Sequence, residues 1–222
     1  NMKVGLILCD HVAMEYQSEF GDYPDMFKEL LPELEFSIFD VTEGEFPENI
    51  SECDAYIGTG SKFSVYEDLP WIRKTLEFVR ELDRLKKCFV GVCFSHQLIG
   101  EALGGKVEKY EGGWCIGVHR FEPPGLNLLM MCQDQIMKLP SRAKVLASTF
   151  KCKNAMIQVD EHILGIQAHP EFTKKYDRML MQTRVDRMGY DTVETGLESL
   201  KMEVDREEIR EYIINFIRKA TT

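Results

Sequence analysis

The sequence of 222 residues lacks the patterns that mark several other kinds of protein. Its seven cysteines are an odd number, with no C-x-x-C pair and no histidine at metal-finger spacing, which disfavours a disulfide framework and a structural zinc site. No apolar stretch approaches the roughly 18 residues of a membrane span, and the opening apolar run of six is too short for a signal peptide. We therefore expect a cytoplasmic protein with reduced thiols and no membrane partner.

Positive charge is also scarce. The formal net charge is −10, and no run of lysine and arginine is long enough to reverse the repulsion of phosphate backbones, so we expect no nucleic-acid partner. Hydrophobic residues make up 44% and charged residues 29%, which is ordinary for a folded globular protein. The length fits one large domain, which we place at residues 2–222.

The arrangement of apolar runs predicts an α/β fold. Four short runs rich in β-branched and aromatic residues are continuous rather than alternating, as expected for strands of a parallel sheet that helices cover on both faces. A helical pattern over 70–87 separates the last two of these runs. Residues 106–168 read as short strands and turns, with the strands at 106–110, 115–121, 126–131, 143–148, 155–159 and 162–169. We expect helices again at 176–188 and 206–219. The four runs are 4–9, 36–41, 55–57 and 88–92.

Cys93 stands at a predicted sharp turn between a strand, 88–92, and a helix that begins at Phe94. Gly91 and Ser95 are small enough to permit a strained corner of the nucleophile-elbow kind. The positive end of the helix dipole would favour the thiolate. The alternative is an inert packed thiol, which is the usual state of a buried cysteine and our expectation for the other six.

A cysteine nucleophile needs a histidine base, and five histidines are present. His96 is close in sequence, but we expect it to turn toward the sheet and satisfy backbone groups. His11, His119 and His162 have no acidic residue at a spacing that would orient them, apart from the generic neighbours Asp160 and Glu161 beside His162.

The segment "GIQAHPEF" offers a better base. Pro170 biases His169 toward extended backbone, where side chains two residues apart project to the same side. His169 and Glu171 would then stand together at the end of the apolar strand 163–168, as a base and the group that orients it. The alternative is an exposed His-Pro-Glu turn.

Two motifs together carry a family resemblance. "GVCFSHQ" at 91–97 and "AHPEF" at 168–172, with Cys93 and His169 separated by 76 positions, resemble the G-x-C-x-G-H-Q and H-P-E motifs of class I glutamine amidotransferases. The likeness extends to "IGTGSKFSVYEDLPWI" at 57–72 and "EALGGKVEKYEGGWCIGVH" at 101–119, and it is closest to the GMP-synthase-like branch that includes γ-glutamyl peptidases. It implies a three-layer, doubly wound, mostly parallel sheet of the flavodoxin-like type, with additional short strands.

The resemblance implies a role for each matching residue. Cys93 would be the nucleophile, His169 the general base and then acid, and Glu171 the group that orients His169. The backbone N–H groups of Gly60 and Phe94 would form the oxyanion hole. No metal or organic cofactor is implied.

Two positions depart from the family pattern. Ser95 replaces the usual glycine, although it is still small enough for the elbow to survive. In "MCQDQI", 131–136, Met131 and Cys132 replace the usual Ser-His, so we expect altered specificity in a loop that contacts substrate largely through its backbone. Residues expected to bind the glutamyl moiety are Gln97, Met131 and Gln133.

These features imply a free-standing cysteine hydrolase of γ-glutamyl amides or peptides, since no nucleotide-binding P-loop and no second domain are found in the sequence. Its partner would be a small γ-glutamyl substrate. One alternative is a glutaminase subunit that delivers ammonia to a separate synthase partner. Another is a binding protein that keeps the fold without the reaction.

Overall fold

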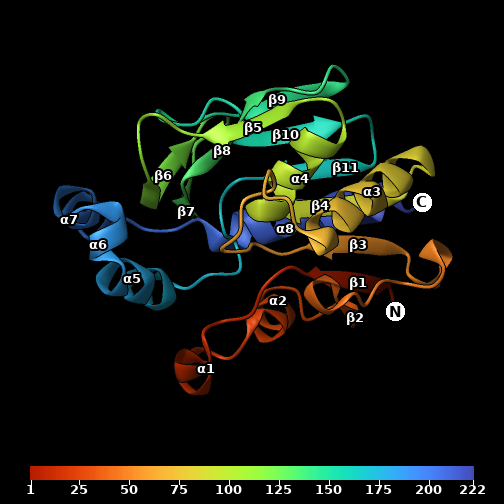
Figure 1. The fold of residues 1–222 in the computed structure, drawn as a ribbon, viewed down its shortest axis with the longest axis horizontal. Helices are drawn as coiled ribbons and strands as arrows, with labels where there is room; N and C mark the ends of the chain where they lie inside the picture. The colour runs from red at the N-terminus through yellow and green to blue at the C-terminus, as the bar shows by residue number, and fades with distance from the viewer.

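The computed structural model describes residues 1–222, and a seven-stranded sheet forms its centre (Figure 1). Five neighbouring strands are parallel, and the last two in the order, β10 and β9, join the sheet through antiparallel pairing. The strand sequence reverses between β1 and β3, which is the topological switch point of a doubly wound fold. In spatial order the strands are β2 (Glu35–Asp40), β1 (Lys3–Leu8), β3 (Ala55–Gly58), β4 (Cys88–Val92), β11 (Ile163–Ile166), β10 (Met156–Val159) and β9 (Ala143–Ala147).

Helices cover both faces of this sheet, so the three-layer α/β prediction is confirmed. On one face Phe27 of α2 (Tyr23–Leu30) and Ile213 of α8 (Arg206–Ala220) share a core with Val90. On the other, α3 (Pro70–Arg84) and α4 (Phe94–Ala102) pack against Phe89. Figure 1 shows α3 and α4 in front of the strands and α8 behind them. Burial of this apolar surface is the main stabilising contribution to the fold.

The edge strand β2 differs from the sequence expectation. Its apolar run predicted burial on both faces, but none of its residues is fully buried. An edge strand has only one neighbour and is covered less completely, so a continuous apolar run does not by itself establish a central position.

Outside the central sheet the chain forms two antiparallel strand pairs and several helices. The pair β5–β8 includes a strand that the sequence did not lead us to expect, and the helix expected over 176–188 is two helices, α5 and α6. No helix has both the length and the apolar character needed to cross a bilayer. The remaining elements are α1 (Met14–Phe20), β5 (Lys106–Lys109), β6 (Cys115–Phe121), β7 (Leu126–Cys132), β8 (Asp134–Lys138), α5 (Lys174–Thr183), α6 (Val185–Met188), α7 (Tyr190–Ser199) and the 3-10 turns Val41–Glu43 and Ile50–Glu52.

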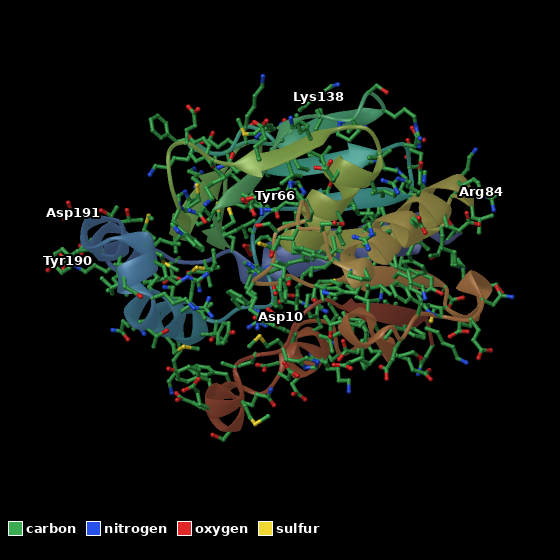
Figure 2. All side chains as sticks on the ribbon, viewed as in Figure 1. Asp10, Tyr66, Arg84, Lys138, Tyr190 and Asp191 are labelled. Atoms are coloured by element: carbon green, nitrogen blue, oxygen red, sulfur yellow. The ribbon has the colours of Figure 1, made fainter.

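Helices α5, α6 and α7 form a C-terminal lobe at one side of the molecule (Figure 1). The lobe has its own core, in which Tyr176 and Met181 of α5 pack with Ile116 and Leu129 of the β6–β7 pair. Figure 2 places Tyr190 and Asp191 at its outer end. Part of the acidic segment that follows Tyr190 is therefore the packed helix α7.

Candidate active site

A cavity of about 290 Å³ opens where the carboxyl ends of the parallel strands meet. Residues from widely separated segments line it, including Asp10 after β1, Cys93 after β4 and His169 after β11. Figure 2 shows Asp10 and Tyr66, both lining residues, near the middle of the molecule. The C-terminal lobe supplies one wall, with Phe172, Tyr176, Leu180, Arg184 and Arg187.

Cys93 has the backbone conformation of a strained elbow. Its φ is 52° and its ψ is −102°, a region that residues other than glycine seldom adopt. The turn is tight because a Cβ at position 91 would lie 2.5 Å from the carbonyl oxygen of Ser95. Cys93 caps the amino end of α4, and its thiol lies 3.5 Å from Nε2 of Gln167. The corner predicted from the sequence is present, and it holds the sulfur at the head of a helix.

His169 lies between a carboxylate and this thiol. Its Nδ1 is 2.9 Å from Oε2 of Glu171, which is only 1% exposed, and its ring stacks on Phe172 at 3.8 Å between centroids. The ring also lies close to Cys93, because Cε1 of His169 and Cβ of Cys93 both adjoin Gly60. Burial alone would lower the pKa of His169, but the charges and hydrogen bonds of Cys93 and Glu171 raise it well above its ordinary value.

Gly60 lies next to both groups, where a side chain could not fit. A Cβ on Gly60 would lie 2.8 Å from Cε1 of His169 and 3.6 Å from Cβ of Cys93. The N–H of Phe94 belongs to the first residue of α4, where the helix offers no acceptor. Both amides expected to form the oxyanion hole are therefore adjacent to the sulfur.

Ser95 fits the elbow through a compensating contact. Its side chain is fully buried, and Oγ donates to the carbonyl oxygen of Thr59 at 2.7 Å. That carbonyl and the N–H of Gly60 belong to one planar peptide group and point in opposite directions. Gly58 makes room for the serine, since a Cβ there would lie 2.3 Å from Oγ of Ser95. The elbow survives the departure from glycine, and the serine holds the peptide that carries the Gly60 N–H.

The three residues expected to bind the glutamyl moiety all line the cavity, but in different ways. Gln97 is nearly buried, and its amide nitrogen donates to the carbonyl oxygen of Asp134 at 2.8 Å. The carbonyl oxygen of Met131 faces the Cys93 sulfur at 3.6 Å. The backbone carbonyl oxygen of Gln133 accepts a hydrogen bond from the backbone N–H of Tyr110 at 2.9 Å. Gln97 therefore also fixes the strand that follows the loop, and a direct role in binding stays a prediction for all three.

Three of the other four histidines make their hydrogen bonds to groups other than Cys93. Nε2 of His96 is 2.9 Å from the carbonyl oxygen of Asn154, and burial lowers the pKa of His96 to about 4, which keeps the ring neutral. Acidic partners that the sequence did not reveal hold two others: His162 lies 2.9 Å from Asp83, and His11 bridges Asp22 and Asp40 at 2.6 and 2.7 Å. These carboxylates come from distant segments, so local spacing gave no sign of them.

One group of residues has the composition of a metal site. Ligand atoms of Asp83, Asp160 and His162 all lie within 4.8 Å of one another. However, the guanidinium of Arg142 donates to Asp83 at 2.7 Å and to Asp160 at 2.6 Å. Because a cation already neutralises these carboxylates, the group is better explained as an ion-pair network.

Several cavity residues were missed by the sequence analysis. Asp10 accepts from the backbone N–H of Lys62 at 2.8 Å, and Asp134 accepts from Ser64 and Tyr66 at 2.6 and 2.7 Å. The position of Asp10 directly after an apolar strand was a usable signal. Arg184 carried no such signal, because it ends a helix rich in charged residues.

The chain is similar to several known proteins in sequence and in fold. The family model described as glutamine amidotransferase class-I matches residues 48–185. Gamma-glutamyl peptidase 4 of Arabidopsis thaliana is 28% identical over 225 residues, covering 90% of this chain and 89% of that protein. A subunit of the glutamine-hydrolyzing GMP synthase of Sulfolobus acidocaldarius is 28% identical over 162 residues, covering 68% of this chain and 85% of that protein.

Solved structures show the same fold. A glutamine amidotransferase from Thermotoga maritima superposes with a TM-score of 0.74 at 19% identity, covering 99% of this chain and 97% of that one. A glutamine amidotransferase from Methylobacillus flagellatus gives a TM-score of 0.75 at 17% identity, covering 99% and 94%. Because the family match spans more than half of its residues, the chain belongs to the class I glutamine amidotransferase family.

Proposed function

We propose that this protein is a cysteine-dependent hydrolase of γ-glutamyl amides or peptides. The observation that carries the proposal is the strained Cys93 at the head of α4, close to a histidine that a buried carboxylate holds. Nucleophile, base and orienting group in this order are the requirements for acyl transfer through a cysteine. The γ-glutamyl peptidase relatives, matched over most of the chain, support the choice of substrate.

In the proposed reaction His169 takes the proton of the Cys93 thiol, and the sulfur attacks the γ-carbonyl carbon and forms a C–S bond. The N–H groups of Gly60 and Phe94 stabilise the charge on the carbonyl oxygen. The His169 imidazolium donates its proton to the leaving nitrogen as the C–N bond breaks. The neutral imidazole next takes a proton from water, whose oxygen attacks the thioester, and glutamate leaves as the sulfur is released.

Covalent labelling tests the nucleophile. A γ-glutamyl diazoketone should add one label to the wild-type protein, measured by intact mass, and none to Cys93→Ala. Cys88→Ala is the matched control, since Cys88 lies buried on the same strand but does not line the cavity. Equal labelling of Cys93→Ala and the wild type, with both proteins folded, would exclude Cys93 as the nucleophile.

A second candidate is a glutaminase subunit that delivers ammonia to a separate synthase, which the similarity to the GMP synthase chain favours. The two functions predict different substrate preferences for the isolated chain. A peptidase turns over γ-glutamyl peptides faster than glutamine, whereas a glutaminase of this kind is slow on both until its synthase is added. Steady-state kinetics of the isolated chain on glutamine and on a γ-glutamyl peptide distinguish them.

A further inference from the structure

Cys132 departs from the family pattern and has no role in the proposed reaction. It ends strand β7, at the position where the Ser-His pair of the family pattern has its histidine, and its thiol is free and 5% exposed. Composition predicted an inert packed thiol here. However, Cys132 lines the same cavity as Cys93, so small molecules that reach one sulfur also reach the surroundings of the other.

The sulfur of Cys93 lies close to the backbone of Cys132. Sγ of Cys93 is 3.6 Å from the carbonyl oxygen of Met131, which belongs to the peptide bond that leads into Cys132. In a trans peptide this oxygen lies about 2.8 Å from the next Cα, so the sulfur is at most about 6.5 Å from Cα of Cys132. Rotation about one Cα–Cβ bond moves a cysteine sulfur by about 3 Å. A disulfide joins Cα atoms about 4.4 to 6.8 Å apart, which this contact allows.

The side chain of Cys132 also faces the side of β7 on which Cys93 lies. Side chains alternate along a strand. Met131 packs in the core of the C-terminal lobe, whereas Met130 and Cys132 pack in the core that contains Cys93. The two thiols therefore share one apolar core as well as one cavity.

Cys132 does not compete with Cys93 as the nucleophile of the reduced protein. Cys115, which lies opposite Cys132 in the β6–β7 pair, burial and the charge of Cys93, in that order, raise the pKa of Cys132 well above its ordinary value. Cys132 therefore stays a neutral thiol when His169 has taken the proton of Cys93. Oxidation of Cys93 to a neutral sulfenic acid removes that charge, so the attacking thiolate of Cys132 forms more easily.

We propose that Cys132 is a resolving cysteine, which forms a reversible disulfide with Cys93 after hydrogen peroxide has oxidised Cys93. The Cys93 sulfur attacks one peroxide oxygen, the O–O bond breaks, and the leaving hydroxide takes the proton held by His169 and departs as water. The Cys132 sulfur then attacks the Cys93 sulfur, the S–O bond breaks, and the hydroxide leaves with the Cys132 proton as a second water. Two thiols are thereby oxidised and one peroxide is reduced.

The disulfide would stop the reaction without destroying the site. A sulfur bonded to Cys132 cannot attack a γ-carbonyl carbon, and it is protected from oxidation to the sulfinic acid, which thiol reductants do not reverse. A dithiol reductant returns both cysteines to thiols. The proposal goes beyond the hydrolase function, because the oxidation needs a reactive Cys93 but no γ-glutamyl substrate.

The test locates the bond by mass spectrometry. The wild type is treated with a few equivalents of hydrogen peroxide, and the remaining thiols are blocked with iodoacetamide in denaturant. Trypsin then separates Cys93, Cys115 and Cys132 into the peptides 88–106, 110–120 and 121–138. We expect a link between 88–106 and 121–138 that dithiothreitol cleaves. A link between 110–120 and 121–138 in its place, or no link at all, would overturn the proposal.

Two variants separate this site from a general sensitivity to peroxide. In folded Cys132→Ser at the same dose, the fraction of Cys93 that dithiothreitol returns to the thiol should fall at least about fivefold, because Cys93 proceeds to the sulfinic and sulfonic acids. Cys88→Ala, which removes the other cysteine of 88–106, is the matched control and should keep both the link and the recovery. Equal recovery in Cys132→Ser and the wild type would exclude the resolving role.

None of these measurements depends on turnover. A wild type that forms the link but hydrolyses neither glutamine nor a γ-glutamyl peptide would contradict the hydrolase and support the disulfide. A wild type that hydrolyses a γ-glutamyl peptide but forms no link would contradict the disulfide alone.

Discussion

At the scale of single residues, the site depends on how Glu171 holds His169. The carboxylate is buried, one oxygen contacts Nδ1, and the other has no hydrogen-bond partner in the protein. A buried charge with so few partners is costly unless it is paired, and the imidazolium of His169 is the group that pairs with it. The charge of Glu171 thus supports the protonated state of His169.

Glu171→Gln should therefore slow the reaction by on the order of 100-fold or more in kcat. It should also move the alkaline limit of the kcat/KM profile to lower pH, because the raised pKa of His169 depends in part on the charge of Glu171. Steady-state kinetics over pH measure both effects. Glu161→Gln, an exposed acid near another histidine, is the control, and a Glu171→Gln profile like that of the wild type would exclude the orienting role.

Ser95 acts through the peptide that carries the Gly60 N–H. Removing the hydroxyl leaves the Thr59 carbonyl without its 2.7 Å donor, so the Gly60 amide is held less firmly. We expect Ser95→Ala to lower kcat about 10-fold with little change in KM, since an oxyanion donor acts mainly in the transition state. The control is Ser148→Ala, whose hydroxyl bonds the carbonyl of Lys153 instead. A tenfold rise in KM at constant kcat would indicate a substrate-binding role.

At the scale of elements, the sequence predicted those whose burial follows from apolar composition. The strands β1, β3 and β4 match their apolar runs to within a residue or two. It did not predict β8, where Asp134 and Gln135 are buried because distant side chains and carbonyls bind them. Helix α7 was also missed, because Gly196 packs closely on Ile116, a contact that composition does not reveal.

The candidate site also contains some contacts that the local sequence predicts and others that it does not. The contact between His169 and Glu171 follows from a spacing of two residues in extended chain, and the Cys93 elbow from a strand that runs directly into a helix. The hydrogen bond from Ser95 to Thr59 joins helix α4 to the segment after β3, 36 residues away, and could be seen only once the sheet was assembled.

Helix α5 carries a buried carboxylate that weakens the fold. Asp177 is fully buried, and neither side-chain oxygen has a hydrogen-bond partner. Burial raises the pKa of Asp177 from 3.8 to about 7, although the charge of His169 and the backbone amide of Gly117 act to lower it. Because the folded state holds the proton more tightly than the unfolded state, stability falls as pH rises from about 4 to 7.

Asp177→Asn should remove this dependence. At pH 8 the variant should gain stability over the wild type, by at most about 4 kcal/mol, and at pH 4 it should gain little. Urea unfolding at the two pH values measures the difference. If the stability of Asp177→Asn falls with pH as steeply as that of the wild type, another group is responsible for the decline.

At the scale of the whole molecule, ion pairs between distant segments give stability a maximum in mild acid. Burial lowers the pKa of His11, but the hydrogen bonds that its ring donates to Asp22 and Asp40 reverse this and raise the pKa above 6.5. The stability that His11 contributes is therefore complete below pH 6.5 and is lost as pH rises through the raised value. The hydrogen bond from Arg142 is the main reason that the pKa of Asp83 is lowered. The stability that Asp83 contributes is therefore lost as pH falls below 3.8.

In Asp177→Asn, which lacks the decline caused by that carboxyl group, we therefore expect the highest unfolding midpoint at about pH 5 to 6, with a decline on each side. Differential scanning calorimetry from pH 3 to 9 tests this. His11→Asn should reduce the decline on the alkaline side and leave the decline on the acidic side unchanged. Above its ordinary pKa, His11 of the wild type keeps its proton only in the folded state, and this contribution to stability is lost as pH rises. A maximum above pH 8 would contradict the expectation.

The organisation of 2–222 as one domain stays a prediction. A single calorimetric unfolding transition is the measurement that tests it.

The close approach of Gly58 and Ser95 makes these two positions dependent on each other over evolutionary time. A methyl group at position 58 would collide with the serine hydroxyl at 2.3 Å, so while residue 95 bears a side chain, residue 58 is confined to glycine. In a relative with glycine at position 95, this collision with the serine would not occur. The order in which such substitutions accumulate in a lineage is therefore constrained, and the effects of the two changes are not additive.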